Sequence, residues 1–177
     1  MTPVEFECCS DCKAELPKLA DNAPTHRYLG SSASCWALFT NMNNAGEPPI
    51  APNRLTPLLT DAYAAQHFGK PSPQAINSVA VHLLALHAVF KHEFNPAKVQ
   101  WVRLRALQNK TTPRHERFHW LTPPDFTDCL TVADIAAAAT AEARGAKTAV
   151  FVQQVYTYWS DLHHQVLAQW YETYISG

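Results

Sequence analysis

The chain has 177 residues, of which 47% are hydrophobic and 16% charged, a composition typical of a globular protein with a lightly charged surface. Its net charge of −1 provides no basic field, which argues against nucleic-acid binding. The sequence contains no run of about 18 apolar residues, so it predicts neither a transmembrane helix nor an association with membranes.

The length of the chain predicts one compact domain over residues 1–177. In this domain a cysteine-rich segment, residues 1–33, packs against a helical bundle formed by residues 34–177. The segment is expected to be irregular, because it combines crowded cysteines with proline and glycine. Ser34 is a suitable N-cap for a first short helix that begins at Cys35.

Caps and apolar spacing predict further helices along the rest of the chain. Ser72–Pro73 and Asn95–Pro96 each combine an N-cap residue with proline at the first helical position, where proline is favoured. Strand-like alternation is nearly absent, so the fold class is mainly α, with about five or six helices in an irregular bundle. The expected helices are 55–68, one opening at Ser72, one opening at Asn95, an alanine-rich helix from Asp128 or Thr131 to Gly145, and a last one over 147–174, with 109–128 as a long connection.

The cysteines make metal binding the first functional hypothesis. Cys9 and Cys12 form a CxxC pair, whose thiolates can bind one tetrahedral Zn²⁺ at about 2.3 Å each; Fe²⁺ is the second candidate ion. His26 and Cys35 lie downstream in the same region and could complete the ligand set, with Cys8 as an alternative partner. No signal peptide is visible, so we expect a cytoplasmic protein with thiols rather than disulfides. A loop with free thiols is the structural alternative.

Three histidines lie on predicted helices where they could face a common interior. His67 shares a helix face with Tyr63. His82 and His163 each lie beside the apolar stripe of their own helix. Imidazoles from facing helices build metal sites in bundles, and three of them would leave an open position for water or substrate. The alternative is that each histidine is buried, hydrogen-bonded and braces helix packing.

Several short motifs, taken together, resemble one known family. They include CxxC, THRYLGSSASCW, TDAYAAQH, NSVAVHLL and WSDLHHQ, and they extend over nearly the whole chain. This combination is similar to DUF5946, an uncharacterised bacterial family described only as a domain of unknown function. The resemblance implies no activity, but its motifs contain the cysteines and histidines singled out above. Lys13 stands where the family pattern has glycine, the residue that usually supplies a special backbone angle.

Two main functional hypotheses follow from these residues. The first is a metal-dependent enzyme acting on a small molecule, in which the metal activates water and Asp61 or a non-ligating histidine is the general base. The second is a non-enzymatic, zinc-stabilised helical module that binds a partner protein or a small ligand. A third, metal-free option uses Cys35 as nucleophile, with His26 or His67 as its base. The candidate catalytic residues are Asp61, Tyr63, His67, His82 and His163, and the candidate metal ligands are Cys9, Cys12, His26 and Cys35.

Overall fold

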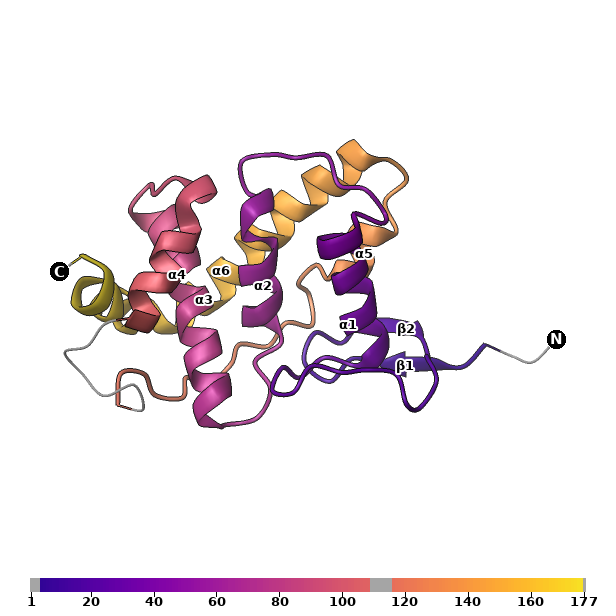
Figure 1. Ribbon diagram of the computed structural model, residues 1–177, viewed down its shortest axis with the longest axis horizontal. Coiled ribbons are helices and arrows are strands. Elements are labelled where there is room, and N and C mark those ends of the chain that lie inside the picture. The colour runs from indigo at the N-terminus through magenta and orange to yellow at the C-terminus, as the bar shows by residue number, and fades with distance from the viewer. Residues whose placement is uncertain (1–3, 109–115, 177) are drawn as a thin grey trace.

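The computed structural model describes residues 4–108 and 116–176, and it is mainly helical (Figure 1). A small β-hairpin and α1 lie at one end of the molecule, and the long helix α6 packs against both α2 and α3. This architecture, with six α-helices in the described ranges, confirms the predicted fold class. The elements are β1 (Phe6–Cys8), β2 (Glu15–Pro17), α1 (Ala33–Thr40), α2 (Leu59–Gln66), α3 (Pro73–Lys91), α4 (Val99–Gln108), α5 (Val132–Ala136) and α6 (Ala141–Tyr171), with single turns at Asn41–Ala45, Thr56–Leu58, Pro96–Lys98 and Glu172–Ser176.

Helix α3 is the central helix of the bundle and packs against α2, α4 and α6. It begins as predicted: the Ser72 hydroxyl accepts a hydrogen bond from the Ala75 N–H, and Pro73 occupies the first turn. In the part of the chain that the structure describes, α3 alone is long and apolar enough to cross a membrane, with a mean hydropathy of 1.3. However, 61% of its most apolar window is buried inside the protein, as is usual for the core helix of a globular fold.

The N-terminal segment contains an antiparallel β-hairpin, whereas the sequence predicted an irregular region. In this hairpin Phe6 lies opposite Pro17 and Cys8 lies opposite Glu15. The turn between the strands carries the CxxC pair, so strand pairing brings the two ends of that turn together. The strands have only three residues each, too few for an alternating pattern to be recognised in the sequence.

Helix α1 begins earlier than predicted and is tied to the hairpin. Its N-cap is Ser32, whose side chain accepts a hydrogen bond from the Cys35 N–H, and not Ser34. Ser34 instead lies inside the first turn, and its hydroxyl donates to the Pro17 carbonyl oxygen at 2.7 Å. The hairpin therefore has a fixed position relative to α1.

The alanine-rich segment contributes to two helices, whereas the sequence predicted one. Helix α5 ends at Ala136, and α6 begins at Ala141 after the N-cap Thr140. Gly145, expected to end a helix, lies inside α6, where glycine is needed because a Cβ would lie 2.5 Å from the Ala51 carbonyl oxygen. High alanine propensity favours a helix without fixing its boundaries, which caps and close contacts determine here.

Candidate metal centre

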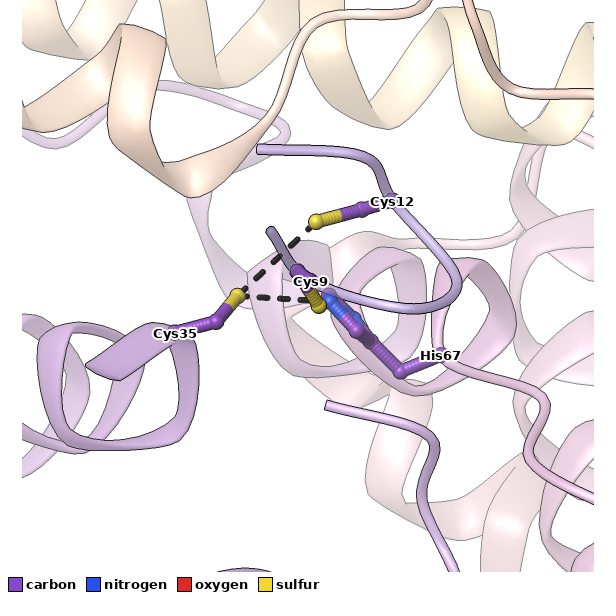
Figure 2. A group of neighbouring side chains, drawn as sticks. All are labelled: Cys9, Cys12, Cys35 and His67. Carbon is purple, nitrogen blue, oxygen red and sulfur yellow. Dashed lines mark hydrogen bonds between the residues drawn. The ribbon is translucent and has the colours of Figure 1, made fainter. Parts of the chain in front are cut away.

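Four side chains from three separate segments converge in the interior beside the hairpin (Figure 2). Cys9 and Cys12 come from the hairpin turn, Cys35 from the first turn of α1, and His67 from the residue that follows α2. Their donor atoms all lie within 4.8 Å of one another. None of the four residues is more than 2% exposed. The fold thus builds a buried group of three sulfur atoms and one imidazole nitrogen.

The spacing of these atoms matches the donor set of one tetrahedral ion. Thiolates about 2.3 Å and an imidazole about 2.0 Å from a tetrahedral Zn²⁺ would be separated by about 3.8 Å (sulfur to sulfur) and about 3.5 Å (sulfur to nitrogen). Cys12 Sγ lies 3.9 Å from Cys35 Sγ, and His67 Nε2 lies 3.3 Å from the same sulfur. A disulfide would need about 2.05 Å. The cluster could therefore hold a metal ion.

The CxxC turn directs both thiols inward because its backbone folds back on itself. The Cys9 N–H donates to the Ala14 carbonyl at 2.9 Å, and the Lys13 N–H donates to the Cys9 carbonyl at 3.0 Å. Lys13 has a φ of 64°, in the left-handed region that glycine adopts without steric strain. Lysine therefore adopts here a backbone conformation that usually favours glycine.

Ser32 connects the turn with α1. While its side chain caps the helix, its backbone N–H donates to Cys9 Sγ at 3.4 Å. An N–H group directed at a sulfur atom stabilises negative charge there, as around thiolates that bind metals. Cys35 lies in the first turn of α1, where the helix dipole also favours a thiolate.

Asp11 lies between the two cysteines of the turn, and its side chain holds the turn close to Gly30 and Gly69. Its Oδ2 accepts a hydrogen bond of 2.8 Å from the Gly69 N–H, two residues after His67. A Cβ at Gly30 would overlap the Asp11 carboxylate, so only glycine permits this approach. Gly69 has a φ of 68°, and a Cβ there would overlap the Tyr28 carbonyl oxygen. Burial raises the pKa of the Asp11 carboxyl group, and the hydrogen bond from Gly69 opposes that rise.

His67 is oriented as a ligand by the end of its own helix. Its Nδ1 lies 2.8 Å from the Tyr63 carbonyl oxygen. Because a carbonyl oxygen only accepts, Nδ1 carries a proton, and in the neutral ring Nε2 presents its lone pair to the thiols. Histidines that bind metals usually donate their second N–H in this way. The Tyr63 ring stacks on Phe39 and lies against the imidazole, and its hydroxyl lies 3.8 Å from Cys35 Sγ.

The buried thiols resist joint ionisation when no cation is present. Hydrogen bonds from Cys12 and Cys35 lower the pKa of the Cys9 thiol far below its usual value. Hydrogen bonding with Cys12 and Cys9, together with burial, raises the pKa of Cys35 far above it. Burial lowers the pKa of His67, but its contacts with Cys12 and Cys9 outweigh burial and raise it to about 10. A cation bound among these donors would favour the thiolates and let their protons leave.

His26, which the sequence predicted as a ligand, lies outside the cluster, and His67 lies there instead. The His26 ring packs edge-on against Tyr28 and Trp36, with centroid distances of 4.5 and 4.7 Å. Its Nδ1 accepts a hydrogen bond of 3.3 Å from the Leu29 N–H. His26 was predicted as a ligand because it follows the CxxC pair closely in sequence, whereas the fourth residue of the cluster, His67, comes from a helix end that only the tertiary fold brings near.

The three helical histidines expected to share one interior site have separate partners. His67 joins the thiols. His82 Nδ1 lies 2.8 Å from Asp61 Oδ1. His163 lies at a kink in α6, where its φ of −132° is not helical, and its Nε2 lies 2.7 Å from the Thr122 carbonyl oxygen. The structure therefore places one histidine in a cluster that could hold a metal ion, one beside a buried carboxylate and one in a helix-to-loop contact.

Arg103 is a residue that sequence reasoning missed. Its Nε donates to Asp61 Oδ1 at 2.8 Å, and its Nη2 donates to Asp61 Oδ2. Asp61 is 0% exposed, and a buried carboxylate needs a charged or hydrogen-bonding partner. The acidic residue among the alanines of α2 was a signal that such a partner exists, but the sequence did not show which residue it is.

One known protein family accounts for most of the chain. A family model described as "Family of unknown function (DUF5946)" matches residues 7–160, which include all four residues of the cluster. No curated protein and no solved structure matches the chain. Since the family model matches most of the sequence, the chain belongs to the family of unknown function DUF5946.

Proposed function

We propose that Cys9, Cys12, Cys35 and His67 bind one Zn²⁺ and that the protein is a zinc-stabilised helical module. The observation that carries this proposal is the orientation of His67, whose Nδ1 donates to the Tyr63 carbonyl while Nε2 lies beside the buried thiols. When bound, zinc supplies the positive charge that lets neighbouring thiols ionise together. The cytoplasmic location expected from the sequence is part of this proposal, because a reducing compartment keeps the thiols available.

A structural role is favoured by the number of donors and by their burial. Structural zinc sites are closed by four protein ligands, whereas catalytic sites keep one position for water or substrate. Here four protein donors are already present, and none of the residues is more than 2% exposed. A metal-dependent enzyme at this cluster, the other function considered from the sequence, would require one donor to leave. Fe²⁺ could use the same donors, but a sulfur-rich tetrahedral set without an open position is most typical of Zn²⁺.

The proposed ion would join the hairpin to α1 and α2. Two strands of three residues have little stability on their own, because an isolated hairpin is at best marginally stable in water. The cluster is the place where the hairpin turn, the start of α1 and the end of α2 meet (Figure 2). Zinc bound there would contribute directly to the free energy of folding, since the unfolded chain does not hold the donors together.

Elemental analysis of the purified chain tests the proposal. We expect one tightly bound zinc per chain in the wild type and its loss in His67→Gln and Cys35→Ser. The matched controls are His26→Gln and Cys8→Ser, which change the same residue types outside the cluster and should retain the metal. A wild-type chain without tightly bound zinc would contradict the proposal. So would loss of zinc in His26→Gln but not in His67→Gln.

A further inference from the structure

A cavity of about 490 Å³ lies beside the first half of α3, and none of the residues that line it belongs to the metal cluster. His82 of α3 and Leu107 of α4 contribute to its wall, together with Tyr28 from the loop before α1. We propose that this cavity is a second, metal-independent site, in which His82 is the general base for hydrolysis of a small, uncharged ester.

The first support is the way His82 is held. Its Nδ1 lies 2.8 Å from Asp61 Oδ1, and the carboxylate of Asp61 also accepts two hydrogen bonds from Arg103. A carboxylate paired with a guanidinium is ionised and only accepts, so the imidazole Nδ1 carries the proton. In the neutral ring, Nε2 is then the atom with a free lone pair, and it has no hydrogen-bond partner among the described residues.

The second support is the balance of charge around the ring. Asp61 is completely buried, whereas the His82 side chain is 19% exposed and lines the cavity. With neutral His82, the negative Asp61 and the positive Arg103 compensate each other. A proton taken up at Nε2 would place positive charge beside both the Asp61 carboxylate and the Arg103 guanidinium, and the hydrogen bond with Asp61 offsets the repulsion from Arg103. Arg103 and Asp61 are therefore positioning residues, and His82 is the group that would meet the substrate.

The third support is the chemistry of the cavity wall, which indicates the class of ligand. Apart from His82, the side chains that line the cavity are uncharged at neutral pH, so they offer no counter-charge to an ionic ligand. Val81 and Leu107 provide apolar surface. The Tyr28 hydroxyl and the Gln74 amide provide donors for a carbonyl oxygen, and neither makes a side-chain hydrogen bond within the described ranges. A mostly apolar cavity of this volume with a few polar groups suits a small neutral carbonyl compound.

The proposed step needs no metal and no redox partner. His82 Nε2 takes a proton from water as the water oxygen attacks the ester carbonyl carbon, and the carbonyl π pair moves onto its oxygen. When that pair returns, the bond to the alkoxy group breaks, and the alkoxy oxygen takes the proton from the imidazolium. The products are a carboxylic acid and an alcohol. Water is the nucleophile in the proposed step.

Hydrolysis of p-nitrophenyl acetate by the zinc-loaded chain tests the inference. His82→Asn keeps an N–H donor for Asp61 but removes the base, so it should lower kcat/KM by about 100-fold or more. Imidazole also hydrolyses this ester without protein, so its rate in buffer alone is subtracted. Above that background, added imidazole should restore part of the rate lost in His82→Asn, an effect that a merely structural histidine would not show. His164→Gln replaces an exposed histidine of α6 that does not line the cavity, and it should leave the rate unchanged.

Zinc content, measured on the same samples, separates this inference from the proposed metal site. His82→Asn should retain its zinc, because His82 lies outside the cluster. The inference is wrong if the wild type hydrolyses the ester no faster than buffer, or if His82→Asn hydrolyses it as fast as the wild type. It is also wrong if the rate falls and imidazole restores none of it. Each of these results would leave the metal site unaffected.

Discussion

Gly30 offers a direct test of how the metal centre is assembled. A Cβ at this position would overlap the Asp11 carboxylate, so Gly30→Ala should turn that side chain away and break its 2.8 Å hydrogen bond with the Gly69 N–H. A hydrogen bond to a charged group contributes about 1.5–3 kcal/mol, and we expect the free energy of unfolding to fall by about 2 kcal/mol. Because Asp11 lies between Cys9 and Cys12, zinc affinity should fall as well.

Urea unfolding of the zinc-loaded protein measures the change in stability, and competition with a chromogenic chelator measures the change in zinc affinity. Asp11→Ala removes the atoms that a Cβ at Gly30 would meet first, so the double variant should be little less stable than Asp11→Ala alone. Gly46→Ala is the control: its φ of 69° makes alanine unfavourable, but a Cβ there meets nothing within 4 Å. This control should keep its zinc affinity. Additive effects of Gly30→Ala and Asp11→Ala, or an unchanged zinc affinity in Gly30→Ala, would refute the reasoning.

Two further changes test the backbone of the turn and the acid sensitivity of the core. Lys13→Gly should raise the free energy of unfolding by about 1 kcal/mol, because the φ of 64° is unfavourable for a residue with a side chain; an unchanged or lower Tm would contradict this. Burial, followed by the charges of His92 and Lys91, lowers the pKa of His87 from 6.5 to about 4. Since the unfolded chain then binds this proton more readily than the folded one, stability should fall as pH is lowered from 6.5 towards 4, by up to about 3 kcal/mol. His87→Asn should flatten this dependence relative to the wild type in urea unfolding at a series of pH values, and equal slopes would argue against the assignment.

The helical framework could be predicted because its signals are local. Ser72–Pro73 and Asn95–Pro96 do begin helical segments, and the Ser72 and Asn95 side chains make the expected capping hydrogen bonds. The alanine-rich region was mispredicted because helix propensity is nearly uniform across it, while the cap at Thr140 and the contact of Gly145 with Ala51 decide where α6 begins and how it packs. Local sequence therefore predicted the helix starts that carry an N-cap residue followed by proline, and it missed the starts capped by Ser32 and Thr140.

The metal cluster was only partly predictable because its last donor depends on tertiary structure. Three cysteines within a short segment indicated a site, and the structure brings Cys9, Cys12 and Cys35 together. Several histidines could complete the set, and proximity in sequence favoured His26. The choice of His67 depends on where α2 ends, since its Nδ1 must reach the Tyr63 carbonyl. Its place just before Phe-Gly was a sign of a helix end, but no periodic pattern shows which way a residue there points.

The spacing of the four donors along the chain has a consequence for the order of folding. Cys12 and Cys35 are 23 residues apart, and Cys35 and His67 are 32 apart. The entropy lost in closing such loops grows only slowly with their length, so one ion could hold both of them closed. A ribosome makes the cysteines first and the histidine last, and the proposed ion would gain its fourth ligand only after α2 has been synthesised. Completion of the site needs no residue of α3, so the hairpin, α1 and α2 would be fixed together by the time the central helix of the bundle packs against them.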